Sequence, residues 1–166
     1  MTLESLNNKE NNSENIILKD TLRSINLLNS KIEEVEKISG DGTPWSKILP
    51  KEGVSVLHNT LVSIDVASRG PLFSDLRRYL EDKAEKEPSG IFVSLLSDLT
   101  MAQEVIWTLS ENKDSILDVL KKFSNTPESI IETNSSELTL IEFTRTESLH
   151  LKNILEKIKS DLGKLE

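Results

Sequence analysis

Few side chains in this sequence could do metal chemistry. The chain contains two histidines and no cysteine, so thiolate metal sites, iron–sulfur clusters and disulfide bonds are excluded. Glu147 and His150 form a Glu-x-x-His unit, which di-iron helical bundles use in pairs together with two further glutamates. The other histidine, His58, has Ser55 three residues before it, so the second unit is missing. We therefore expect no metal site and no cofactor.

Nucleophilic and acid–base catalysis also lack a signature. A catalytic serine needs a base oriented beside it, and the sequence has no Gly-x-Ser-x-Gly elbow. His58 borders an apolar stripe, as a hydrogen-bonded boundary residue does. Acidic residues cluster at 33–36 and 81–87, which is typical of solvated helix faces, and Asp65 is expected to face water too. The sequence predicts no catalytic residue and a non-enzymatic protein.

Charge and composition narrow the class of partner. The net charge is −8, which argues against direct nucleic-acid binding because phosphate affinity comes mainly from Lys and Arg. Aromatic residues make up only 4% of the chain, so the core must be aliphatic, as in helical bundles. The first residues have no apolar signal-peptide region, and no run approaches the length of a membrane span. We expect an intracellular protein, cytoplasmic or nuclear, that does not bind membranes.

The apolar residues that would position any site recur at helical spacing. We expect a polar, disordered arm over 1–13 and one helical domain over 14–166. The first helix, at 14–39, carries apolar residues three or four apart, close to a heptad seam. Gly40 and Pro44 then stop it. The same period predicts further helices at 52–68, 72–86, 91–111 and from Asp114.

The two tryptophans have different expected roles. Trp45 follows the glycine-rich stop beside Ile48 and Leu49, in a segment that is either a helical turn or a loop that plugs a groove. As a loop residue, Trp45 is the better candidate for an exposed anchor. Trp107 lies in the most apolar predicted helix, whose wide apolar arc favours a central place in the bundle, and we expect it in the core.

The stretch 129–144 is ambiguous. Its β-branched and aromatic residues flank a turn-forming cluster at 134–136, and we favour a small hairpin. The alternative is a helix from Asn134 to the end. Thr144 and Glu147 fit a capping box, which would begin the last helix there. That helix carries a second heptad-like seam. The predicted fold is thus mainly α: a single bundle of five to six helices with coiled-coil-like first and last helices and this hairpin.

These patterns favour a non-catalytic helical adaptor or structural subunit of an intracellular multiprotein complex. Its partners would be other protein subunits bound through helix packing, or further copies of the chain. The candidate partner-binding residues are Leu18, Ile25, Leu28, Ile32, Val35, Trp45, Leu151, Leu155, Ile158 and Leu162. If the first seam is a docking surface, replacing Ile25 and Ile32 with aspartate abolishes partner capture and leaves the domain folded. The alternatives are an accessory subunit of a nucleic-acid-processing complex and a helical-bundle enzyme or ligand-binding protein.

Overall fold

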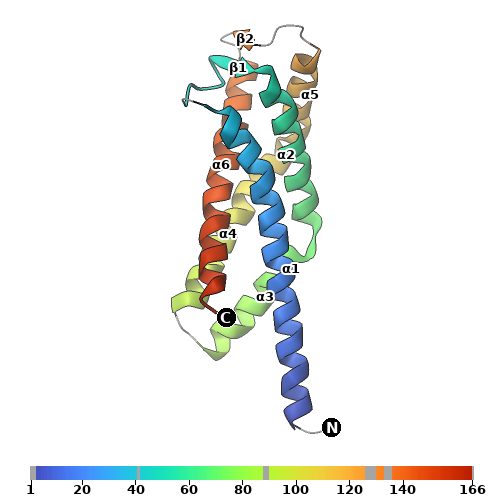
Figure 1. The fold of residues 1–166 in the computed structure, drawn as a ribbon, viewed down its shortest axis with the longest axis vertical. Coiled ribbons are helices and arrows are strands. Elements are labelled where there is room, and N and C mark those ends of the chain that lie inside the picture. Colours follow the sequence, from blue (N-terminus) through green and yellow to red (C-terminus); the bar gives the residue numbers. More distant parts are fainter. Residues whose placement is uncertain (1–2, 41, 88–89, 126–129, 133–135, 166) are drawn as a thin grey trace.

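The computed structural model describes residues 3–40, 42–87, 90–125, 130–132 and 136–165. Within these ranges the chain forms a helical bundle with two short strands (Figure 1). The elements are α1 (Leu3–Ile38), β1 (Ile48–Pro50), α2 (Lys51–Arg69), α3 (Pro71–Lys86), α4 (Gly90–Glu111), α5 (Lys113–Ser124), β2 (Ile130–Glu132) and α6 (Ser136–Gly163). The predicted mainly helical bundle is confirmed, and the predicted bounds of α2, α3 and α4 agree to within one residue.

Helix α1 begins at Leu3 and not at residue 14 as expected. Residues 3–38 contain no glycine and no proline, so nothing in the backbone interrupts the helix across the polar segment. Residues 3–13, expected to be a disordered arm, therefore belong to α1, and residues 1–2 lie outside the described part. Figure 1 shows these first turns extending past the rest of the bundle. The helix stops where Gly40 and Gly42 take φ values of 60° and 86°, which L side chains rarely adopt.

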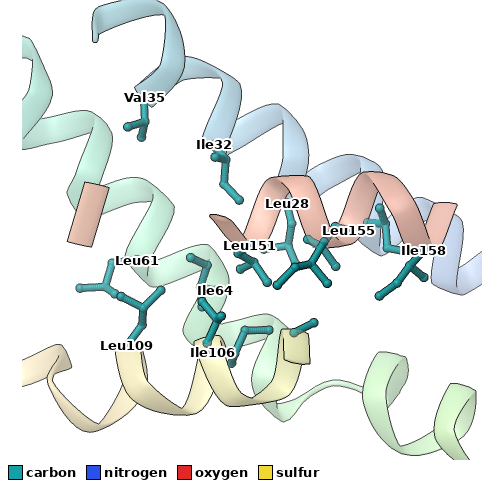
Figure 2. Close-up of a cluster of buried hydrophobic side chains, with 14 of the residues drawn as sticks. Leu28, Ile32, Val35, Leu61, Ile64, Ile106, Leu109, Leu151, Leu155 and Ile158 are labelled. Carbon is teal, nitrogen blue, oxygen red and sulfur yellow. The ribbon is translucent and has the colours of Figure 1, made fainter. Parts of the chain in front are cut away.

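Helices α1 and α6 lie side by side and run in opposite directions (Figure 1). An ion pair of 3.3 Å between Glu36 and Lys152 joins them at the surface. Beneath it, Figure 2 shows a cluster of buried aliphatic side chains from four helices, labelled Leu28, Ile32, Val35, Leu61, Ile64, Ile106, Leu109, Leu151, Leu155 and Ile158. Burying one such side chain stabilises the fold by about 1.5–3 kcal/mol, so both terminal seams are used to build this core.

The predicted hairpin near residues 129–144 does not form. Strand β2 pairs antiparallel with β1, so that Leu49 lies opposite Ile131, and residues 136–144 are the first turns of α6. The second half of the stretch therefore follows the helical alternative. Residue 129 and residues 133–135, which include most of the turn expected at 134–136, lie outside the described residues.

Polar residues inside the core explain why the start of α6 was misplaced. Leu138, Ile141, Thr144, Arg145 and Ser148 are all buried, at the three- and four-residue spacing of one helix face. Three of these five positions are polar, so the sequence shows no continuous apolar stripe that would extend the last helix back to Leu138. Thr144, expected to cap the helix, lies within it, and its hydroxyl donates to the carbonyl oxygen of Leu140 at 2.8 Å.

Candidate protein-binding site

An open groove of about 1310 Å³ lies where the end of α1, the first turns of α2 and α5 meet. Helix α2 packs against both α1 and α5, so these two helices flank its N-terminal half. Pro50, with φ of −65°, directly precedes the first residue of α2. Glycines 40 and 42 end α1 on the other side. Pro50 therefore fixes where the α2 wall begins, and the two glycines fix where the α1 wall ends.

The floor of the groove is apolar. Val54 of α2 and Leu120 of α5 are buried there, and Ile38 of α1 and Leu117 of α5 are half-buried beside them. Each of these residues is part of the helical stripe that builds its own helix into the bundle. The half-buried Ile38 and Leu117 form an apolar strip that the described residues do not cover.

The rim of the groove carries both signs of charge. Lys37, Lys51 and Lys121 lie on it together with Glu52 and Asp118. Within the described part of the chain, Lys37, Asp118 and Lys121 form no ion pair. These charges are exposed to solvent and can meet charges on a bound molecule.

Three further polar side chains of α2, Ser55, His58 and Asn59, line the groove. His58 is exposed, in keeping with its expected place at the edge of the apolar stripe. The hydroxyl of Ser55 donates to the carbonyl oxygen of Glu52 at 3.2 Å, so its hydrogen points into its own helix. Apolar floor, charged rim and open shape together suit the docking of an amphipathic segment.

All ten candidate partner-binding residues lie in the interior and not at this groove. Each is buried by other parts of the same chain, and Figure 2 shows residues of the first and last seams facing each other. In this fold they offer no surface to a partner. The expectation that both seams are docking surfaces is therefore corrected. The seams pack internally, because the heptad-like apolar stripe of α1 lies against the apolar stripe of α6.

The two tryptophans exchange their expected places. Trp45 is 1% exposed and Trp107 is 64% exposed, so the loop residue is core and the residue of the apolar helix is on the surface. The Trp45 ring packs on Gly53 of α2, where an added Cβ would come within 2.9 Å of the ring. The backbone amide of Ile48 donates to the carbonyl oxygen of Pro44 at 3.2 Å, so the segment that the sequence left open forms one hydrogen-bonded turn and then enters β1.

The residues weighed for metal chemistry stay apart from any such site. His150 is exposed on α6 and Glu147 is half-buried. Among the described residues, no group of three or more His, Asp or Glu side chains could hold a metal ion. Asp65, expected to face water, accepts from Arg69 at 2.9 Å and from Lys113 at 3.2 Å, and so ties α2 to the start of α5.

Sequence reasoning identified the groove residues as members of helical stripes but did not find the groove. A stripe marks one face of a helix, and nothing in the sequence shows that two neighbouring helices leave part of that face open. In the sequence, Lys37 beside Ile38 and Lys121 beside Leu120 were the available sign of a charged rim. Exposed lysines are common on every helix, so this sign was not specific.

No family model, no curated protein and no solved structure matches this chain. Among the described residues, no helix combines the length and the apolar character needed to cross a bilayer.

Proposed function

We propose that this chain is a non-catalytic helical adaptor or structural subunit of an intracellular multiprotein complex. It holds an amphipathic helix of a partner protein in the groove between α1, α2 and α5. The observation that carries the proposal is the groove itself, whose apolar floor, left partly open by the described residues, lies between charged rims.

The size of the groove favours a peptide over a small molecule. Small-molecule pockets have volumes of about 300–1,000 Å³ and enclose most of their ligand, whereas this groove is open and measures about 1310 Å³. One face of a short helix, with apolar side chains three or four residues apart, fits an open apolar strip of this kind.

The rim charges would set the orientation of the bound helix. Lys37 and Lys121 attract carboxylates, and Asp118 attracts Lys or Arg side chains. Such exposed pairs add little affinity, about 0–1 kcal/mol each, but they disfavour partners that carry the wrong charge at the wrong position. Affinity would come from apolar side chains of the partner that cover Ile38 and Leu117.

The test compares a groove variant with a matched control. Leu117→Asp places a charge on the apolar floor, and Val66→Asp places the same charge on an exposed valine of α2 outside the groove. Helical peptides selected from a display library on the wild-type chain are titrated against both variants by fluorescence anisotropy. We expect at least about a tenfold loss for Leu117→Asp, since each factor of ten is about 1.4 kcal/mol, and no change for Val66→Asp.

A second variant guards against unfolding. Lys121→Glu reverses an exposed rim charge and leaves the floor intact, so circular dichroism and thermal melting should match the wild type. Peptides that bind both Leu117→Asp and Lys121→Glu as tightly as the wild type would contradict the proposal. Tight, salt-sensitive binding of labelled DNA or RNA by the wild-type chain would favour the nucleic-acid alternative instead.

A further inference from the structure

The outer face of α4 carries a second row of residues at heptad-like spacing. Its members are all exposed, and the spacing between them is four, three, four, three and four: Val93, Ser97, Thr100, Glu104, Trp107 and Glu111. Val93 is 58% exposed and Trp107 is 64% exposed. The buried residues of α4 pack on α3 and α6, and at Thr100 the exposed row borders α3. Helix α4 is thus apolar toward the core and has large apolar side chains on the solvent side too.

A hollow beside Trp107 could receive a side chain from outside. It measures about 560 Å³ and lies between α4 and the junction of α2 with α3, lined by Ser68, Phe73, Gln103, Glu104 and Trp107 among others. Arg77 of α3 donates to the side chains of Gln103 and Thr100, which holds this wall in place. The hydroxyl of Ser110, which also lines the hollow, has no hydrogen-bond partner among the described residues.

When two copies of α4 pack antiparallel, the large apolar residues of one row lie opposite those of the other. If a second copy runs antiparallel with Thr100 opposite Thr100, then Val93 faces Trp107 and Ser97 faces Gln103. The small residues lie at the centre, and the large ones meet at both ends. The two Glu104 side chains are then offset by eight residues, about 12 Å along the helix axes at 1.5 Å per residue, so like charges do not meet.

The charges of α4 also select the antiparallel direction. The helix contains no Lys or Arg, its first turn has no acidic residue, and Glu111 lies at its C-terminal end. A carboxylate is unfavourable at that end of a helix dipole and favourable at the other. An antiparallel copy brings Glu111 toward the N-terminal end of the second α4. A parallel copy would instead place Glu104 against Glu104 and Glu111 against Glu111.

We infer that the outer face of α4 is a homodimer interface, in which two copies of this chain pack antiparallel about Thr100 and the Val93 of each copy enters the hollow beside Trp107 of the other. This surface shares no residue with the groove of α1, α2 and α5, so the inference stands apart from the proposed function. A dimer would present two such grooves.

Sedimentation velocity over a concentration series tests whether the dimer forms. A single helix row lies at the small end of interface sizes, below about 1,200 Å² in total, so we expect a weak, reversible dimer that appears at the upper end of the series. We expect Trp107→Ser to weaken it at least tenfold, and Val66→Ser, which changes an equally exposed residue of α2, to leave it unchanged. A wild-type chain that stays monomeric throughout overturns the inference, as does a dimer that is indifferent to Trp107→Ser; a different protein would then be the occupant of this face.

Engineered thiols test the arrangement. The chain has no cysteine, so Thr100→Cys introduces its sole thiol on the proposed two-fold axis, and mild oxidation should give a covalent dimer. Glu104→Cys should stay uncrosslinked, because its two copies are offset by more than the Cα separation of about 7 Å that a disulfide spans. Efficient crosslinking of Glu104→Cys, or none of Thr100→Cys, overturns the antiparallel arrangement.

Discussion

The backbone amide of Trp45 donates a hydrogen bond of 2.6 Å to Oε2 of Glu142, a residue 97 positions later in the chain. The same carboxylate accepts from Nε of Arg145 at 2.9 Å and from its terminal nitrogen at 2.5 Å. The Arg145 guanidinium lies 5.4 Å from the centre of the Trp45 ring. One carboxylate thus holds the 45–49 loop onto α6 and neutralises a buried arginine.

Glu142→Ala should be strongly destabilising. It leaves the buried Arg145 without its anion, and an unpaired buried charge costs about 3–5 kcal/mol. Because Glu142 keeps some contact with solvent, we expect a loss near 3 kcal/mol in the free energy of unfolding, measured by urea denaturation. The double variant Glu142→Leu with Arg145→Met removes both charges and should lose less than Glu142→Ala. An equal or larger loss in the double variant would contradict the role given to the ion pair.

Gly53→Ala should destabilise the protein although alanine favours helices. The helix propensity gain is about 1 kcal/mol, but the new Cβ would lie 2.9 Å from the ring of Trp45, which is itself fully enclosed. Overpacking of this kind costs about 1–3 kcal/mol, so the net effect should be a lower melting temperature. Gly90→Ala is the control, since its Cβ meets nothing within 4 Å; it should be neutral or stabilising.

Replacing both Ile25 and Ile32 with aspartate should unfold the isolated chain. Both isoleucines are completely buried, and a buried carboxylate without a partner costs several kcal/mol, against a typical total stability of about 5–15 kcal/mol. Leu27→Asp, on the same helix but on its exposed side, should keep the wild-type circular dichroism spectrum and melting curve. A folded double variant would show that the first seam is dispensable to the core.

Alkaline pH should loosen the contact between α1 and α3. Burial, and then the charge of Glu14, raises the pKa of Tyr79 above its ordinary value. The hydrogen bond from Lys83 to Glu14, 3.1 Å long, raises the pKa of Lys83. Both groups therefore favour the folded state below their ordinary pKa values, and this stability is lost as pH rises above about 10 through the raised values.

Tyr79 is the only tyrosine, so absorbance at the tyrosinate band follows it directly. Its titration midpoint in the folded chain should lie above that in denaturant, and Glu14→Gln should move it downward. Because Glu14 and Lys83 are partly exposed, Glu14→Gln should cost little stability near neutral pH, within about 1 kcal/mol. A midpoint that does not respond to Glu14→Gln would contradict this assignment of the cause.

Two of the places where sequence reasoning failed, the start of α6 and the position of Trp107, share one feature. Thr144, Arg145 and Ser148 are polar residues at interior positions of α6, and Val93 and Trp107 are apolar residues at exterior positions of α4. At the first set of positions polar side chains are buried, and at the second set apolar side chains are exposed. Pattern reading assumes that residue type and burial agree, so it began the last helix too late and placed Trp107 on the wrong side of α4.

The sequence by itself determined that this chain is helical, and where α2, α3 and α4 begin and end, because apolar period and helix-breaking residues act over a few positions of the chain. Only the tertiary structure decided that the first and last seams cover each other, that β1 pairs with β2, and that a groove stays open beside α2. A stripe spaced by three and four residues marks the face of a helix that must be buried, but which neighbour buries it depends on contacts between residues far apart in the chain.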